Sequence, residues 1–339
     1  MIVFGDTNLG YLSLLLVYPL IIWRVFRRFL PTDWAFVLLT LFVATPIGAY
    51  FGSTFFLYVK YALQGFGDPV SYLFYLAGLA LIVGWPPEGP GNRFGAACAG
   101  AALLFLATFV RPIVAPAVAV LLGGAGLAAL WQRQWSRLAG LCAGFAPVLA
   151  MPLHNWYFGD RLVLFSANAS GNNLHVTPAD YVAALVEMSH LNFAGPHVHA
   201  VAIQLIDWPT GFIGQRDLGG LAAYAASAPV HLAAIAILVY VAGWGRRYDP
   251  WLRLIAGAAL AQHTVAFFYG GASRYFFLTW LLTMLVAAVW CERDGIALFR
   301  RFAPNVAERI ARSRLAAGLG AALTSIEGWL QLGGTGLRA

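Results

Sequence analysis

The chain has 339 residues, of which 60% are hydrophobic and only 10% are charged, and its formal net charge is +7. This composition is typical of an integral membrane protein. The arginines are spread over short loops and not massed on one soluble face, so the positive charge does not indicate a nucleic-acid partner. The three cysteines, Cys98, Cys142 and Cys291, show no CxxC spacing, which argues against a disulfide framework and a zinc site.

Nine apolar runs follow one another along the chain. Six precede a long polar stretch and three follow it, near residues 9–25, 34–50, 70–85, 94–110, 113–131, 138–153, 230–244, 252–269 and 276–290. Each run is close to the ~20 residues that an α-helix needs to cross a bilayer, with Gly or Pro at the edges of the shorter ones. We therefore predict an all-α, polytopic membrane helix bundle with about nine transmembrane helices.

The basic residues are unequally divided between the loops that join these runs. With the N-terminus outside, the outer loops hold only Lys60, Arg111, Arg161, Arg216 and Arg274, and all other basic residues fall in the cytoplasm. This distribution follows the positive-inside rule and predicts an outside N-terminus and a cytoplasmic C-terminus. Because no basic region precedes the first run, we expect that run to stay in the membrane and not to be cleaved as a signal peptide.

These runs divide the chain into two parts of different character. They are a transmembrane bundle over residues 1–292, with outer loops at 52–68 and 154–229, and a basic tail over residues 293–339. The longer outer loop contains apolar pieces near 181–188 and 198–206, which we expect to form short helices along the membrane. In the tail, arginines lie between apolar residues at helical spacing, which predicts an amphipathic helix on the anionic cytoplasmic leaflet.

Two arginines stand at the outer ends of apolar runs, where a charge is costly unless it has an anionic partner or reaches the interface. Arg111 directly precedes Pro112, and Arg274 directly precedes Tyr275. Two forked guanidinium groups at the same depth and on the same face suit a lipid-linked phosphate or diphosphate. The alternative is that each arginine only reaches the outer headgroups as an interfacial anchor.

Among the outer carboxylates, Asp68 is the best candidate for a general base toward a hydroxyl group. It stands in Gly67-Asp68-Pro69 at the mouth of a span, on the same outer side as Lys60. As a helix N-cap it would have a purely structural use. The outer histidines are His190, His197 and His199. No second carboxylate or Cys stands near them at a spacing usual for metal ligands, so no metal site is predicted.

The order of several short motifs is similar to that in membrane glycosyltransferases of the GT-C superfamily, of the ArnT and protein-O-mannosyltransferase type, which use lipid-linked sugars. The motifs are Ala44-Thr45-Pro46, Asp68 at the head of a helix, Arg111-Pro112, His154-Asn155-Trp156-Tyr157-Phe158-Gly159-Asp160 and Ser273-Arg274-Tyr275-Phe276. They cover most of the predicted bundle, but each one is short and degenerate.

This resemblance implies transfer of a sugar from a polyprenyl-phosphate donor to a surface glycan or lipid acceptor, on the outer face of a bacterial inner membrane. It implies catalytic carboxylates at Asp68 and Asp6. The substrate-binding residues that follow from it are Arg111, Arg274, Tyr275, Lys60 and Asn155. No cofactor is certain from these residues, and a divalent cation is kept as a candidate.

One departure from the family concerns the first outer loop, which carries its principal catalytic Asp. Asp6 is the only remnant of such a loop in this sequence, which therefore reads as lacking N-terminal helices of the family. Two other functions stay open. A lipid or glycan flippase would use the same arginines as a polar path through the bilayer, and a non-catalytic assembly partner would complement a separate catalytic subunit.

Overall fold

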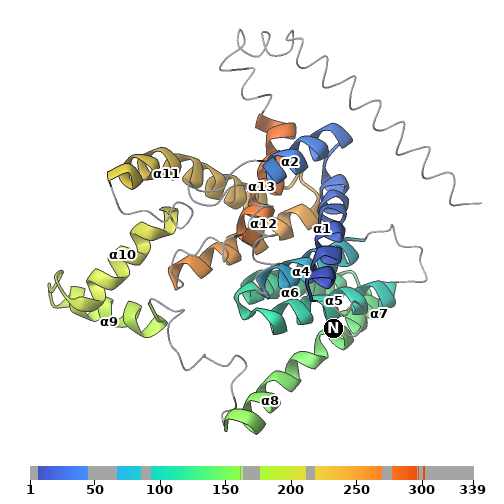
Figure 1. Ribbon diagram of the computed structural model, residues 1–339, viewed down its shortest axis with the longest axis horizontal. Coiled ribbons are helices and arrows are strands. Elements are labelled where there is room, and N and C mark those ends of the chain that lie inside the picture. The colour runs from blue at the N-terminus through green and yellow to red at the C-terminus, as the bar shows by residue number, and fades with distance from the viewer. Residues whose placement is uncertain are drawn as a thin grey trace, which may run out of the picture.

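The computed structural model describes residues 7–44, 67–84, 93–160, 162, 176–210, 218–268, 277–295, 297 and 301. All regular structure in these residues is helical, as the sequence predicts (Figure 1). The α-helices are α1 (Thr7–Phe29), α2 (Thr32–Ala44), α4 (Asp68–Val83), α5 (Arg93–Val110), α6 (Ala115–Trp131), α7 (Trp135–Phe145), α8 (Ala150–Gly159), α9 (Pro178–Ser189), α10 (Pro196–Thr210), α11 (Leu218–Val239), α12 (Pro250–His263) and α13 (Phe277–Trp290). Short 3-10 or π segments adjoin them: η1 (Pro112–Val114), η2 (Ala146–Leu149), η3 (Tyr240–Trp244), η4 (Thr264–Phe267) and η6 (Cys291–Gly295).

Each of the nine apolar runs overlaps one or more helical segments in the described part of the chain. Within that part, three continuous helical stretches are long and apolar enough to cross a membrane, namely Arg93–Val110, Pro112–Trp131 and Trp135–Gly159. Shorter apolar helices are Thr32–Phe42, Asp68–Val83 and Pro229–Trp244. The number of nine spans and the orientation of the termini stay predictions.

Proline and its neighbours set several helix boundaries. Pro69 and Pro250 stand in the first turns of α4 and α12, where the missing amide proton costs nothing. Pro112 breaks the chain between α5 and η1, and Arg111 before it is extended, with φ −146° and ψ 100°. Gly84 ends α4 in the left-handed region, with φ 91°. Arg111 is thus held at a break between two helical segments.

Glycine lets α4, α5 and α7 approach one another closely. A Cβ atom at Gly78 would lie 2.8 Å from the Gly100 carbonyl oxygen, and one at Gly144 would lie 2.1 Å from the Cys98 carbonyl oxygen. Gly140 meets the Phe94 carbonyl oxygen in the same way, at 2.5 Å. Small residues at such spacing allow helices to pack by backbone contact, as is common inside membranes. These contacts unite the three helices seen together at the lower right of Figure 1.

An aromatic cluster joins α1, α2, α4 and α13. Phe277, the first residue of α13, stacks on Tyr72 with ring centroids 5.2 Å apart. Its ring also lies 5.4 Å from that of Phe42 and 5.9 Å from that of Tyr18. The first turn of α13 therefore lies beside the second turn of α4.

The two apolar pieces of the predicted outer loop 154–229 are helical, as α9 and α10, and pack on each other. Tyr181 of α9 donates a hydrogen bond to the Phe267 carbonyl oxygen at 2.6 Å, and its ring lies 5.7 Å from that of Phe268. These contacts attach α9 to the end of α12, through η4. In Figure 1, α9 and α10 lie at the left, apart from the group formed by α4 to α7.

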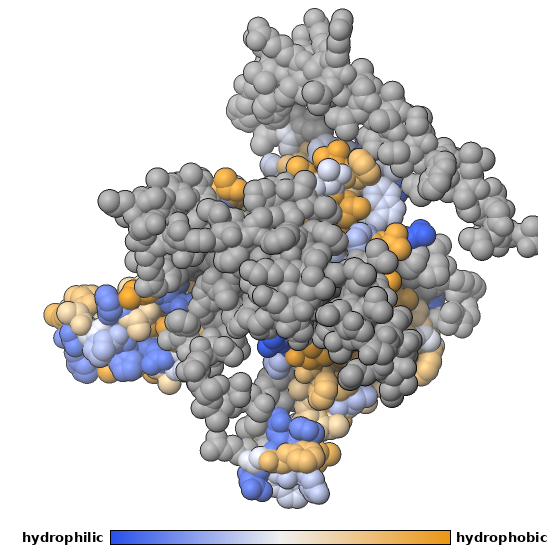
Figure 2. Space-filling view, viewed as in Figure 1, coloured by the Kyte–Doolittle hydropathy of each residue, from blue (hydrophilic) through white to orange (hydrophobic). Residues whose placement is uncertain are grey.

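Large apolar side chains are exposed along α6, η2 and α8. They include Leu127, Leu149, Leu153, Trp156, Tyr157 and Phe158. Apolar residues are also visible on the face drawn in Figure 2, between the grey parts. Exposed apolar surface of this extent is characteristic of a protein that faces lipid or a partner.

Candidate functional site

Buried polar side chains gather at one end of the bundle. Those on α4, α5, α12 and α13 are Asp68, Ser71, Thr108, Gln262, His263, Thr279 and Thr283. All of them lie in the first two turns of α4 or α13, or in the last turn of α5 or α12. The predicted topology assigns these helix ends to the outer face, and we refer to this end as the polar end.

An ion pair between Asp68 and Arg111 forms the centre of the polar end. Arg111 Nη2 donates to Asp68 Oδ2 at 2.9 Å. The Asp68 side chain is only 1% exposed, whereas that of Arg111 is 32% exposed. The carboxylate stands at the N-terminus of α4 and the guanidinium at the C-terminus of α5, so each charge also has a favourable sign toward its helix dipole. Asp68 and Arg111, which the sequence predicts separately as a base and a phosphate ligand, are therefore in direct contact.

The local sequence explains how the pair forms. Extended backbone at Arg111, imposed by Pro112, turns the chain out of α5 next to the start of α4. Gly67 leaves room for this approach, because a Cβ atom there would lie 2.9 Å from Val110 Cγ1 and 3.6 Å from Arg111 Nε. One turn along α4, Ser71 Oγ donates to the Ala107 carbonyl oxygen at 2.8 Å, which fixes α4 against α5.

Arg111 retains donor capacity beyond Asp68. Its Nε is buried and has no hydrogen-bond partner among the described residues. A guanidinium carries five N–H donors and matches the geometry of a phosphate. With one donor fixed on Asp68 and about a third of the side chain exposed, Arg111 can contact an anion while the ion pair stays formed.

Gln262 supports the chain break beside this pair. Its Nε2 donates to the Ile113 carbonyl oxygen at 2.9 Å, two residues after Arg111. This buried hydrogen bond fixes the end of α12 against the segment that follows the break. Gln262 was not among the residues predicted for the site. The signal for it in the sequence is an amide side chain within an apolar run.

Three rings extend the polar end toward α11. The centroids of His231 and His263 are 5.3 Å apart, and Trp280 lies 5.5 Å from the first and 5.7 Å from the second. His263 Nε2 and Thr283 Oγ1 are 3.1 Å apart, within hydrogen-bond distance. These histidines therefore join α11, α12 and α13, which is the helix-contact role expected of polar residues inside a membrane bundle.

Two carboxylates of the predicted outer loop 154–229 have structural partners. Asp180 completes a capping box with Thr177 at the start of α9 and lies 3.1 Å from His197 Nδ1. Hydrogen bonds from the Thr177 backbone and hydroxyl hold the pKa of Asp180 below its usual value, which makes it a weak base. Glu187 accepts a hydrogen bond from the Val198 amide at 3.0 Å. Asp68 differs from these two carboxylates in that its partner, Arg111, is itself a candidate phosphate ligand.

The structure brings only part of the predicted site together. Asp68 and Arg111 are paired, whereas Asn155 lies on α8, which projects from the bundle at the bottom of Figure 1. Asp6, Lys60, Arg274 and Tyr275 lie outside the described residues. Within the described ranges, no three His, Cys, Asp or Glu side chains are grouped as metal ligands would be.

Comparison of the chain with protein-family models, with curated proteins and with solved structures finds no match.

Proposed function

We propose that this protein is a membrane glycosyltransferase that moves a sugar from a polyprenyl-phosphate donor to a glycan or lipid acceptor at the outer face of the membrane. The observation that carries the proposal is the pairing of Asp68 and Arg111 at the polar end. A carboxylate and a phosphate-binding cation are the two groups that this reaction needs within reach of one another. The resemblance of the Arg111-Pro112 and Ser273-Arg274-Tyr275-Phe276 motifs to GT-C enzymes supports the same reaction.

In the proposed reaction, the acceptor hydroxyl oxygen forms a bond to the anomeric carbon of the sugar. The bond from that carbon to the phosphate oxygen breaks, and its electron pair leaves with the lipid phosphate. Arg111 stabilises the charge that develops on this phosphate, and Asp68 takes the hydroxyl proton. The ion pair fixes the orientation of both side chains before the substrates bind, which lowers the cost of arranging them.

Arg274 is proposed as the second phosphate ligand. Phe277, which opens the helix following Arg274 in the sequence, stacks on Tyr72 one turn from Asp68. Two guanidinium groups would match the charge of a phosphate or diphosphate better than one.

The distribution of polar groups favours a transferase over a flippase. A flippase needs polar side chains along a path from one membrane face to the other. In the described parts of α4, α5, α12 and α13, the buried polar side chains are confined to the polar end. A site at one face is what a reaction between a lipid-linked donor and an external acceptor requires.

Sugar transfer and donor binding by the purified full chain in lipid nanodiscs test the proposal, with a panel of polyprenyl-phosphate sugars as donors. Asp68→Asn is expected to lower turnover while donor binding is retained, because it removes a base and not a phosphate contact. Arg111→Ala or Arg274→Ala should weaken donor binding about tenfold or more, and Arg111→Lys should already impair transfer.

Asp160→Asn and Arg246→Gln are the matched controls, since Asp160 only ends α8 and Arg246 is exposed at the other end of the bundle. Both should leave binding and transfer unchanged. Unchanged donor binding in the double variant Arg111→Ala, Arg274→Ala would mean that neither arginine binds the donor and that both are only interface anchors. The assembly-partner function would then be the better explanation of the chain.

A further inference from the structure

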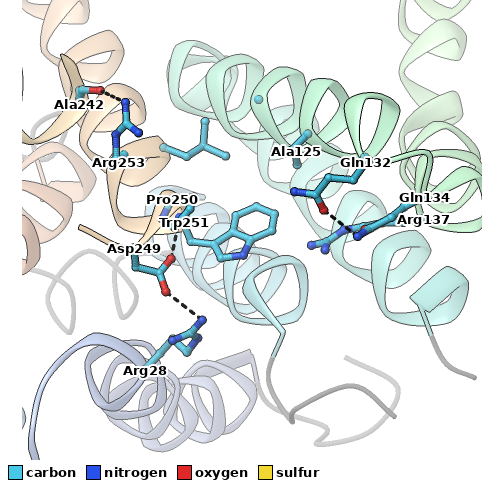
Figure 3. Close-up of a pocket in the computed structure, with 14 residues that line it drawn as sticks. Arg28, Ala125, Gln132, Gln134, Arg137, Ala242, Asp249, Pro250, Trp251 and Arg253 are labelled. Atoms are coloured by element: carbon cyan, nitrogen blue, oxygen red, sulfur yellow. Dashed lines mark hydrogen bonds and ion pairs between the residues drawn. The ribbon is translucent and has the colours of Figure 1, made fainter. Parts of the chain in front are cut away.

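A pocket of about 540 Å³ opens at the end of the bundle opposite Asp68 (Figure 3). Its walls come from the last turn of α1, the second half of α6, the start of α7, η3 and the first turns of α12. The volume is within the range of ordinary ligand sites, roughly 300 to 1,000 Å³. We refer to it as the basic pocket, because three arginines line it.

The charges of the basic pocket are not balanced. Arg28, Arg137 and Arg253 line it together with a single carboxylate, Asp249. Asp249 Oδ2 accepts from Arg28 Nη2 at 3.1 Å, and its Oδ1 accepts from the Trp251 amide at 2.8 Å, as the dashed lines in Figure 3 show. Both oxygens of the only carboxylate are therefore engaged, and the pocket keeps an excess of positive charge.

Arg253 is the arginine best placed to hold an anion. One of its terminal nitrogens donates to the Ala242 carbonyl oxygen at 3.3 Å, which anchors the side chain. Its Nε is buried and has no hydrogen-bond partner among the described residues. A buried N–H donor without an acceptor is costly unless an anion or water satisfies it.

The other walls fix the shape of the pocket. The Arg137 guanidinium lies 4.7 Å from the centroid of the Trp251 ring and also donates to the Ile82 carbonyl oxygen at the end of α4. Gln134 Nε2 donates to Gln132 Oε1 at 2.7 Å on the rim. On α6, small residues such as Ala125 and Ala128 leave the centre open. Polar donors thus surround a small apolar floor.

Tryptophans mark the depth of the basic pocket in a membrane. Trp131, Trp135 and Trp244 stand at the ends of α6, α7 and η3 that form the pocket walls, and all three are exposed, Trp131 to 90%. Exposed tryptophans at helix ends are typical of the headgroup layer. The positive-inside distribution assigns these ends to the cytoplasmic leaflet, where anionic lipids concentrate.

We propose that the basic pocket binds the phosphate group of an anionic phospholipid. Forked guanidinium donors from Arg28 and Arg253 would hold the phosphate oxygens, and the small floor of α6 would accept the adjoining glycerol. A free phosphate shares this chemistry, but the exposed tryptophans at the same depth favour a ligand attached to lipid. The proposal does not depend on sugar transfer at the polar end.

Native mass spectrometry of the full chain, released from phosphatidylcholine vesicles that contain phosphatidic acid, measures the retained lipid. Retention of phosphatidic acid over phosphatidylcholine is expected, and Arg28→Gln combined with Arg253→Gln should reduce it about tenfold or more. Ala128→Trp fills the pocket without changing its charge and should also abolish retention. Asp249→Asn keeps the cap of α12 but removes the negative charge, so retention should rise several-fold.

Arg246→Gln is the matched control, because it removes an exposed arginine near the same end but outside the pocket. Its lipid retention should equal that of the unchanged chain.

Competition with inorganic phosphate distinguishes a lipid ligand from free phosphate. Displacement of the lipid only at a large excess of phosphate supports a lipid ligand, and displacement at equal concentration overturns the lipid proposal in favour of free phosphate. Equal retention of phosphatidic acid by the Arg28→Gln, Arg253→Gln double variant and by Arg246→Gln would show that the basic pocket is not the binding site. The rise with Asp249→Asn cannot come from misfolding.

Discussion

The two ends of the bundle each contain an arginine to aspartate ion pair, but the pairs lie in different surroundings. At the polar end, Arg111 and Asp68 are 2.9 Å apart and the carboxylate is 1% exposed. At the basic pocket, Arg28 and Asp249 are 3.1 Å apart, with side chains 40% and 26% exposed. The distances are nearly equal, so burial and not geometry decides how much each pair contributes.

This difference explains why the two ends suit different ligands. Among the described residues of the polar end, one arginine pairs with one buried carboxylate and polar side chains fix neighbouring helices, which suits a reaction that needs groups at set positions. At the basic pocket, arginines outnumber the carboxylate and the site is open, which suits binding of an anion from the membrane surface.

The largest expected effect is on the buried pair. Asp68→Asn should destabilise the folded chain by about 2 to 3 kcal/mol, because it removes a charged hydrogen bond and leaves Arg111 without its counter-charge. Arg28→Gln should cost less than about 1 kcal/mol, since its pair is solvated. The unfolding midpoints of both variants in one lipid and detergent mixture check this. Equal losses would mean that burial does not distinguish the pairs.

A second test concerns the packing of α7 on α5, where glycine allows backbone contact. Gly144→Ala should destabilise by about 2 kcal/mol, because its Cβ would lie 2.1 Å from the Cys98 carbonyl oxygen and α7 must move from α5. Gly123→Ala on α6 is the matched control, since nothing lies within 4 Å of its Cβ position. Unfolding midpoints should fall for the first and not for the second. Equal changes in the unfolding midpoints of Gly144→Ala and Gly123→Ala would show that the close approach of α7 to α5 does not stabilise the fold.

The smallest effect belongs to a half-buried carboxylate, Asp180, on the same predicted face as Asp68. Hydrogen bonds with Thr177 lower the pKa of Asp180 in the folded chain. The ionised carboxylate therefore stabilises the fold above the unfolded pKa of about 3.8, and this stabilisation is lost as pH falls through the lower, folded pKa. Hydrogen exchange in the first turn of α9 should therefore accelerate below about pH 4. Asp180→Asn should remove this pH dependence, and an identical pH profile in that variant would show that another group is responsible.

Helix positions are the part of this structure that the sequence predicts best. The apolar runs coincide with helices, and Pro69, Pro112 and Pro250 stand at helix starts where a missing amide proton is tolerated. Asp68 and Arg111 were candidates from sequence because charges at the ends of apolar runs are costly and therefore informative. The nine spans, the orientation and sugar transfer stay predictions.

Long-range contacts could not be predicted in this way. Asp68 and Arg111 are 43 residues apart, and Gln262 bonds a carbonyl 149 residues away. Hydrophobicity and proline determine where a helix begins and ends, because those effects act within a few residues. They do not determine which neighbour a helix packs against or how it is rotated.

The order and rotation of the helices come from contacts distributed over the whole bundle, such as the approach of Gly144 to Cys98 and the stacking of Phe277 on Tyr72. The sequence by itself therefore determined an all-helical chain with scarce charges at its helix ends. Only the tertiary structure decided that Asp68 faces Arg111 and that Arg28, Arg137 and Arg253 surround one pocket. The physical reason is that side chains far apart in sequence meet only after close packing has fixed the helices relative to one another.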